Sequence, residues 1–186
     1  MPMRVIAGHA KGRALKLVPG DTTRPIMARV KEALFSILGT AVFDASFLDL
    51  YAGTGSVGIE ALSRGAGYAM FVEREAAAAR IIEENLQATG FSEQASVLRA
   101  NVFDFVRRPA SRAFEIIYIA PPQYKGIWQQ TLTLLDEHPD HIAPDGIVIV
   151  QIDPQEKEPI VLNALVPTDE RRYGNTLLWF FEHPGE

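Results

Sequence analysis

The sequence contains no cysteine among its 186 residues. Disulfide bonds, cysteine-ligated zinc sites and thiolate catalysis are therefore excluded. No stretch approaches the roughly 18 consecutive apolar residues of a membrane span, and the first residues, MPMRVIAGHAKGR, contain no apolar signal core. We therefore expect a cytoplasmic protein that has neither a membrane nor a metal ion as a partner.

Acidic residues are scarce at the start of the chain, although the whole chain has a net charge of −5. Residues 1–31 contain seven basic residues and one acidic residue, a net charge of +6, whereas the remaining 155 contain 11 basic and 22 acidic residues, a net charge of −11. A basic segment on an acidic body predicts a polyanionic partner bound at one end. A basic hairpin that contacts only solvent is the alternative. The candidate RNA-binding residues are Arg4, Lys11, Arg13, Arg24 and Arg29.

The first 40 residues are predicted to form a β-hairpin and a helix. Two short strands, RVIAGHA and ALKLV, flank a glycine-containing turn, and a helix is expected over about residues 26–39. Its apolar residues recur at helical spacing from Val30 to Leu38, whereas Arg29 and Lys31 fall outside that stripe. We therefore predict an RNA-binding extension over residues 1–40 and a second domain over residues 41–186.

From residue 46 onward, short apolar strands alternate with helical segments, which predicts an α/β fold with a doubly wound, mainly parallel sheet. Seven strands are expected in this sheet: SFLDLY, YAMFVE, ASVLRA, FEIIYIA, GIVIVQI, IVLNALV and NTLLWFFE. Because only Pro167–Gly174 connects the last two, a helical crossover does not fit between them. We therefore expect the last strand to be antiparallel.

A glycine-rich loop, DLYAGTGSVG, follows the first strand of this sheet. Gly53, Gly55 and Gly58 form a GxGxxG pattern, and Glu73 closes the next strand 20 residues after Gly53. This is the fingerprint of a dinucleotide site, in which glycines allow a close approach of the backbone and the acid accepts ribose hydroxyls. The same features suit S-adenosylmethionine. A loop that serves only strand–helix packing is a third interpretation.

Three features favour S-adenosylmethionine over a dinucleotide. Asp49 lies four residues before Gly53, where a methyltransferase uses an acid to hold the loop and a dinucleotide site usually has an apolar residue. A basic extension precedes the loop, and no later segment offers an arrangement for hydride transfer. After the third strand, Asn101 can reach an adenine amine or cap a helix. The candidate cofactor-binding residues are Asp49, Ala52, Gly53, Thr54, Gly55, Gly58, Glu73, Arg74, Asn101 and Val102.

Two consecutive prolines follow the fourth strand in IIYIAPPQYKGIW, where they stop the strand and fix a rigid turn. The turn resembles motif IV of amino-methyltransferases, which has Asp or Asn, two prolines and then an aromatic residue. In that motif the acid or amide and a backbone carbonyl accept hydrogen bonds from the target amine, and the aromatic ring stacks on the base. The candidate catalytic residues are Ala120, Pro121, Pro122, Gln123 and Tyr124.

The turn departs from motif IV at two positions. Ala120 occupies the position of the acid or amide, and Gln123 occupies that of the aromatic residue. Gln123 could supply the missing carbonyl and Tyr124 could still stack on a base. The alternative is a structural turn in a protein that has lost activity.

The whole chain resembles the bacterial 16S rRNA guanine-N2 methyltransferase family, the small RsmD-type enzymes that modify guanine 966. The resemblance is carried by RVIAGHAKGRALKL, TRPIMARVKEALFSIL, DLYAGTGSVGIEALSRGA, IAPPQY and RRYGNTLLWF. It implies a Rossmann-like class I methyltransferase with an N-terminal β-hairpin extension, which uses S-adenosylmethionine. It also implies a substrate in the small ribosomal subunit or its assembly intermediate, and we expect a monomer.

The resemblance implies a role for several of the candidate residues. Gly53 and Gly55 would line the cofactor, Glu73 would hold its ribose, and Asn101 would lie near its adenine. Pro121, Pro122 and Tyr124 would frame the target guanine, with Arg24 and Arg29 at the mouth of the active site.

Other functions compete with this assignment. A DNA adenine-amine methyltransferase would share both motifs, although 186 residues leave little room for a separate DNA-recognition domain. A catalytically silent RNA-binding or ribosome-assembly factor is consistent with Ala120. Asp49 and the Pro-Pro turn argue against a nicotinamide-dependent dehydrogenase.

Overall fold

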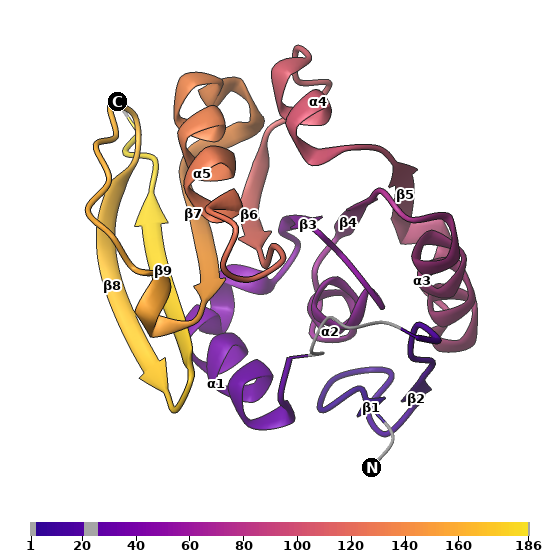
Figure 1. Ribbon diagram of the computed structural model, residues 1–186. Coiled ribbons are helices and arrows are strands. Elements are labelled where there is room, and N and C mark those ends of the chain that lie inside the picture. Colours follow the sequence, from indigo (N-terminus) through magenta and orange to yellow (C-terminus); the bar gives the residue numbers. More distant parts are fainter. Residues whose placement is uncertain (1–2, 21–25, 186) are drawn as a thin grey trace. The chain divides into compact units, whose positions relative to one another are not determined.

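The computed structural model describes residues 3–20 and 26–185, and the chain forms two compact units, residues 1–100 and 101–186. In the first unit, β3, β4 and β5 form parallel pairs in the order β5-β4-β3 (Figure 1). The elements of this unit are β1 (Met3–Arg4), β2 (Ala14–Leu15), α1 (Ala28–Leu38), η1 (Gly39–Val42), β3 (Ser46–Leu50), α2 (Ser56–Ser63), β4 (Tyr68–Glu73), α3 (Ala76–Thr89), η2 (Ser92–Gln94) and β5 (Ala95–Arg99).

The helices that follow β3 and β4 cover the strands through their apolar residues. Helix α2 packs against β3 and β4, and α3 packs against β4 and β5. The buried residues of α3 include Ala78, Ile82 and Leu86, which recur every four positions and therefore form one face. The polar Asn85 lies in that same buried face.

The hairpin prediction was correct in position and wrong in extent. Strands β1 and β2 have two residues each, so most of RVIAGHA and ALKLV is not strand. The backbone N–H groups of Ile6 and Ala7 donate to the Glu60 carboxylate at 2.9 and 3.0 Å. These amides are therefore bound to a side chain of α2 instead of a neighbouring strand.

Helix α1 confirms the helix predicted over residues 26–39, and it ends at Gly39 with a positive φ of 53°. Lys31 was expected outside the apolar stripe, and that expectation was wrong, since only 2% of the residue is exposed. Its ammonium pairs with the buried Glu60 at 3.1 Å, which allows burial. Arg24, a candidate RNA-binding residue, lies outside the described residues.

In the second unit the strands follow the order β6-β7-β9-β8 (Figure 1). Strand β6 is parallel to β7, whereas β9 is antiparallel to both β7 and β8. The rings of Trp128 on α5 and Trp179 on β9 meet with their centroids 5.6 Å apart. The elements of this unit are α4 (Val102–Arg107), β6 (Phe114–Ile119), α5 (Ile127–Glu137), η3 (Pro139–His141), β7 (Ile142–Ile152), η4 (Pro154–Glu156), β8 (Val166–Tyr173) and β9 (Thr176–Glu182).

The predicted strand IVLNALV was wrong. The backbone N–H groups of residues 163–165 donate to the buried carboxylate of Asp136 at 2.7–2.9 Å, so they are not available to a strand. The true strand β8 occupies the segment that we expected to be a connection. A two-residue turn at Gly174-Asn175 joins it to β9, because Tyr173 pairs with Thr176.

Within residues 3–20 and 26–185, seven strands besides the hairpin, with β9 antiparallel to its neighbours, confirm the predicted α/β fold class and the antiparallel last strand. The separate extension over residues 1–40 stays a prediction. In the part of the chain that the structure describes, no helix is long and apolar enough to cross a membrane. Nor do the described residues bring together three or more His, Asp or Glu side chains that could hold a metal ion.

Candidate functional site

The glycine-rich loop lies between β3 and α2 and depends on left-handed backbone conformations. Gly53 and Gly55 have positive φ values of 59° and 80°, which side chains other than glycine rarely tolerate. A Cβ on Gly53 would meet no atom within 4 Å, so space is open beside the loop at this residue. The loop therefore leaves room for a ligand to approach the backbone.

Gly58 is needed for a different reason, which is the close packing of α2 on β4. A Cβ at this position would lie 2.4 Å from Cε1 of Phe71, closer than real Cβ contacts allow. The Gly58 N–H donates to Oδ2 of Asp49 at 3.1 Å. Asp49 therefore fixes the start of α2 from the end of β3, and its role toward the methionine end of a cofactor stays a prediction.

Glu73 holds the opposite side of the loop from the end of β4. Its Oε2 accepts a hydrogen bond from the Gly53 N–H at 2.9 Å, and its Oε1 accepts one from the Glu75 N–H at 3.1 Å. A carboxylate offers about four lone-pair sites, so both oxygens retain capacity for ligand hydroxyls. This half-buried carboxylate is suited to bind a ribose diol.

Asp49 is an acid whose ionised form is poorly stabilised by the protein. Burial raises the pKa of Asp49 well above its ordinary value, the Gly58 N–H opposes this rise, and the nearby Glu73 adds to it. No ion pair to Asp49 occurs among the described residues. An uncompensated acid beside a second acid is an arrangement that favours a cationic ligand.

The sequence did not predict two buried polar residues that hold the loop. Asn85 on α3 donates from Nδ2 to the Thr54 carbonyl at 3.0 Å, and Lys31 on α1 donates from Nζ to Oγ of Ser56 at 2.9 Å. Asn85 and Lys31 are 1% and 2% exposed. A polar residue at a position where the helical spacing predicts an apolar one is the signal that could have identified Asn85.

The other predicted residues of the loop region have modest contacts. Ala52 is buried, and Oγ1 of Thr54 accepts from the Ser56 N–H at 3.3 Å. Arg74 is exposed and its Nε donates to Oε1 of Glu75 at 3.3 Å. Their roles toward a cofactor stay predictions.

Asn101 and Val102 begin the second unit. Oδ1 of Asn101 accepts from the Phe103 N–H at 2.8 Å and so caps α4, as one of our two interpretations required. Val102 is buried. A contact of Asn101 with adenine is compatible with this cap, because Nδ2 does not take part in it, and stays a prediction.

The Pro-Pro turn follows β6 directly. Pro121 is buried and Ala120 and Pro122 are half-buried, whereas Gln123 is exposed. Tyr124 has a positive φ of 62°, a conformation that is rare for a residue with a side chain. The residue is 62% exposed, so it is accessible to a planar ligand.

Two carboxylates after β7 hold Tyr124 in this conformation. The Tyr124 N–H donates to Oε1 of Glu156 at 2.7 Å, and its hydroxyl donates to Oδ2 of Asp153. The remaining oxygens of Asp153 and Glu156 form the capping box of η4. The hydrogen bond from Tyr124 lowers the pKa of Asp153 below its ordinary value. Each carboxylate therefore accepts a hydrogen bond of the capping box with one oxygen and a hydrogen bond from Tyr124 with the other.

The four described candidate RNA-binding residues, Arg4, Lys11, Arg13 and Arg29, are exposed. Nη1 of Arg4 donates to the Gly12 carbonyl at 2.8 Å, and Nη1 of Arg13 donates to the Ala88 carbonyl at 3.2 Å. Lys11 and Arg29 are also exposed. Their exposure is compatible with phosphate binding, which stays a prediction.

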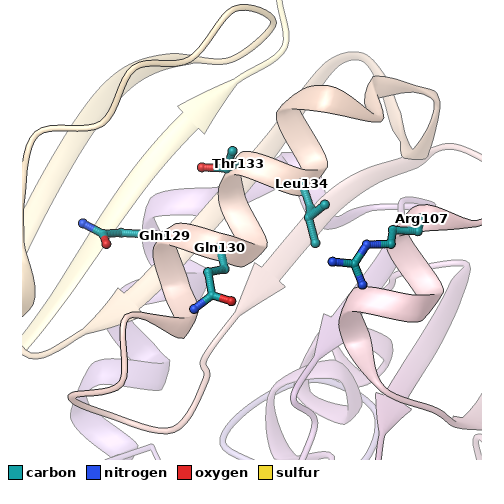
Figure 2. A pocket seen from close by; sticks show the side chains of 5 residues that line it. All are labelled: Arg107, Gln129, Gln130, Thr133 and Leu134. Atoms are coloured by element: carbon teal, nitrogen blue, oxygen red, sulfur yellow. The ribbon is translucent and has the colours of Figure 1, made fainter.

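A separate open pocket of about 320 Å³ lies beside α4 and α5 in the second unit (Figure 2). The Arg107 side chain of α4 points toward Gln130 and Leu134 of α5 (Figure 2). None of the predicted cofactor or substrate residues lines this pocket. We therefore do not include it in the candidate site.

Comparison with known proteins identifies relatives of the whole chain. Residues 3–182 match the family model described as "Conserved hypothetical protein 95". The chain is 34% identical to "Ribosomal RNA small subunit methyltransferase D" of Haemophilus influenzae, over 81% of this chain and 79% of that protein. The solved structure described as "Putative methyltransferase yhhF from Escherichia coli" is 30% identical, covers 100% of both chains and has a TM-score of 0.86.

A more distant solved structure has the same fold. It is an RNA methyltransferase from Salinibacter ruber in complex with S-adenosyl-L-homocysteine, 14% identical, with a TM-score of 0.68 over 88% of this chain and 95% of that one. The fold, the glycine loop and its two acids define a Rossmann-like class I methyltransferase. The chain belongs to the family of ribosomal RNA small subunit methyltransferase D.

Proposed function

We propose that this protein transfers a methyl group from S-adenosylmethionine to the exocyclic N2 amine of a guanine in 16S rRNA. The observation that carries the proposal is that a chain of this family keeps both acids at the glycine loop and an accessible aromatic ring after the Pro-Pro turn. The guanine-966 position rests on the family resemblance. We further propose that a monomer acts in the cytoplasm on the small subunit or its assembly intermediate.

The residues of the first unit fit this cofactor. Glu73 can accept hydrogen bonds from the ribose hydroxyls, and the open side of Gly53 leaves space for the ligand. Asp49 and Glu73 together favour a cation, and S-adenosylmethionine carries a positively charged sulfur. When bound, this cofactor supplies an activated methyl group.

The residues of the second unit act on the base. The Pro-Pro turn presents backbone carbonyls that can accept hydrogen bonds from the target amine, and the ring of Tyr124 can stack on the guanine. Ala120 offers no side-chain acceptor. Orientation and exclusion of water supply most of the rate enhancement in such a site, and the proton can leave to solvent. A strong base is therefore not required.

Replacement of the buried acid Asp49 by its amide is expected to affect the stability of the protein and its affinity for the cofactor in opposite directions. A raised pKa means that the stabilising contribution of the protonated acid is present below its ordinary pKa of 3.8 and is lost as the pH rises toward the raised value. Asp49→Asn keeps an oxygen for the Gly58 N–H without the charge. We expect its free energy of unfolding at pH 7 to equal or exceed that of the wild type, while affinity for S-adenosylmethionine falls by about tenfold.

Denaturant unfolding at pH 4 and pH 7, together with calorimetry of the cofactor, tests this prediction. The stability difference between Asp49→Asn and the wild type is expected to shrink at the lower pH, because the raised pKa of Asp49 favours its neutral form there. A variant that is less stable at pH 7 and binds the cofactor normally would contradict the expectation.

Charge reversal in the basic extension tests RNA binding. Lys11→Glu is expected to weaken binding to a 16S rRNA fragment and to reduce the slope of log affinity against log salt by about one, because one phosphate contact is lost. Arg80→Glu, an exposed reversal on α3, is the matched control. If both variants behave alike, the extension is a solvated hairpin.

Methyl transfer to small ribosomal subunits that lack the modification tests the proposed function. Tritiated cofactor and digestion to nucleosides are expected to yield N2-methylguanosine, and N6-methyladenosine in DNA instead would favour the alternative substrate. Ala120→Asp restores the side-chain acceptor and is expected to preserve or raise the rate. If the wild type is inactive and Ala120→Asp is active, the protein is a silent RNA-binding factor.

A further inference from the structure

Two buried side chains connect the N-terminal hairpin to the glycine-rich loop, both within the first unit. Asn85 accepts from the Lys16 N–H at 2.7 Å and donates to the Lys16 carbonyl at 3.1 Å, so it pairs with the backbone directly after β2. The same Nδ2 donates to the Thr54 carbonyl of the loop at 3.0 Å. One amide therefore joins a hairpin strand to the loop.

Lys31 makes the equivalent connection for the other strand. Its ammonium donates to the Arg4 carbonyl in β1 at 3.1 Å and to Oγ of Ser56 at 2.9 Å. The third partner is Oε1 of Glu60, whose carboxylate also accepts the amides of Ile6 and Ala7. Thr54 and Ser56 are the two neighbours of Gly55. Each hairpin strand is therefore tied to one side of the central glycine of the loop.

These connections make the conformation of the hairpin and that of the glycine-rich loop depend on each other. If the hairpin left α2, Asn85 would lose both hydrogen bonds with Lys16. Its side chain would then be held only by the Thr54 carbonyl among these partners. Lys31 would lose the Arg4 carbonyl, and Glu60 would lose two backbone donors. Asn85 and Lys31 are each held by partners in both segments, so an ordered loop keeps them in position for the hairpin, and a docked hairpin keeps them in position for the loop.

We propose that Asn85 and Lys31 are positioning residues that couple RNA binding by the hairpin to cofactor binding by the loop. A ligand that requires the ordered loop then strengthens binding of a ligand that requires the docked hairpin, and the effect is reciprocal by linkage. The proposal rests on the proposed function for the identity of the two ligands. It adds that RNA and cofactor bind with positive cooperativity through these two side chains.

The test is calorimetry of S-adenosylhomocysteine with the full chain, alone and saturated with a 16S rRNA fragment. We expect the RNA to strengthen binding of the wild type by about 5- to 30-fold, within the usual range of coupling between sites. Asn85→Ala is expected to reduce this ratio to less than about twofold. Gln87→Ala, an exposed change on the same helix, is the matched control and should keep the ratio. A purely structural role of Asn85 would weaken the binding of both ligands and leave the ratio of cofactor affinities with and without RNA unchanged. That result would overturn the proposal.

A second pair of variants tests the docking of the hairpin without a change at Asn85. One variant displaces the hairpin and the other is its control. A Cβ at Gly8 would lie 1.8 Å from the Ser63 carbonyl oxygen, whereas one at Gly12 would meet no atom within 4 Å, and both glycines have φ near 85°. Gly8→Ala should therefore abolish the coupling and Gly12→Ala should retain it. Equal coupling in both variants would overturn the proposal. Wild-type protein that binds both ligands without coupling also overturns it and leaves the proposed function intact, whereas failure to bind S-adenosylhomocysteine overturns both.

Discussion

Replacement of Glu73 by alanine is expected to weaken binding of S-adenosylhomocysteine by about 1.5–3 kcal/mol, or one to two powers of ten in the dissociation constant. The carboxylate lies at the end of β4, accepts the Gly53 N–H and retains capacity for two ribose hydroxyls. The substitution removes those acceptors and also releases Gly53. Isothermal titration calorimetry of the variant and the wild type measures the loss.

Two further variants isolate the cause of that loss. Glu73→Gln keeps one side-chain oxygen, so its affinity for S-adenosylhomocysteine should lie between those of the wild type and Glu73→Ala. Glu75→Ala removes an equal charge two residues away, from an exposed side chain that pairs with Arg74, and should bind the cofactor almost normally. If Glu75→Ala loses as much affinity as Glu73→Ala, general electrostatics governs binding and the ribose assignment is wrong.

Replacement of Tyr124 by alanine is expected to lower kcat/KM for methyl transfer by about 5- to 150-fold, because base stacking is worth about 1–3 kcal/mol. Tyr124 is 62% exposed, and its backbone N–H and hydroxyl are both held by the carboxylates after β7. The ring is thus oriented before the base arrives, which reduces the entropy lost on binding. Tritiated methyl transfer to unmodified small subunits gives the rates.

Tyr124→Phe is the matched control because it keeps the ring and removes the hydroxyl that donates to Asp153. We expect it to retain most of the activity. Cofactor affinity should be unchanged in both variants, since the assigned cofactor residues are elsewhere in the chain. Equal activity of Tyr124→Ala and the wild type would show that the ring does not take part in substrate binding.

The parts of the fold that the sequence predicted are those with a local signal. Apolar residues at strand and helix spacing indicated β3, α2, β4 and α3, and glycine with acids at fixed spacing indicated the loop. Strand β8 has no such signal, because it is a charged, exposed edge strand whose only described strand partner is β9. The Gly174-Asn175 turn was the available indication, and it was missed.

The parts of the site that the sequence did not predict depend on partners distant in the chain. Lys31 is buried because Glu60, 29 residues later, neutralises it. Asn85 has a function in the fold only because Lys16 and Thr54 lie beside it. Likewise, no local pattern connects Tyr124 with Asp153 and Glu156. Such pairings form only after the strands and helices have packed.

The most direct test of the central claim is mass spectrometry of 16S rRNA from cells with and without the gene for this protein. We predict that deletion removes one methyl group, located on the N2 amine of a single guanine, and that a plasmid copy restores it. A 16S rRNA with the same complete set of methylated nucleosides in both strains would contradict the account.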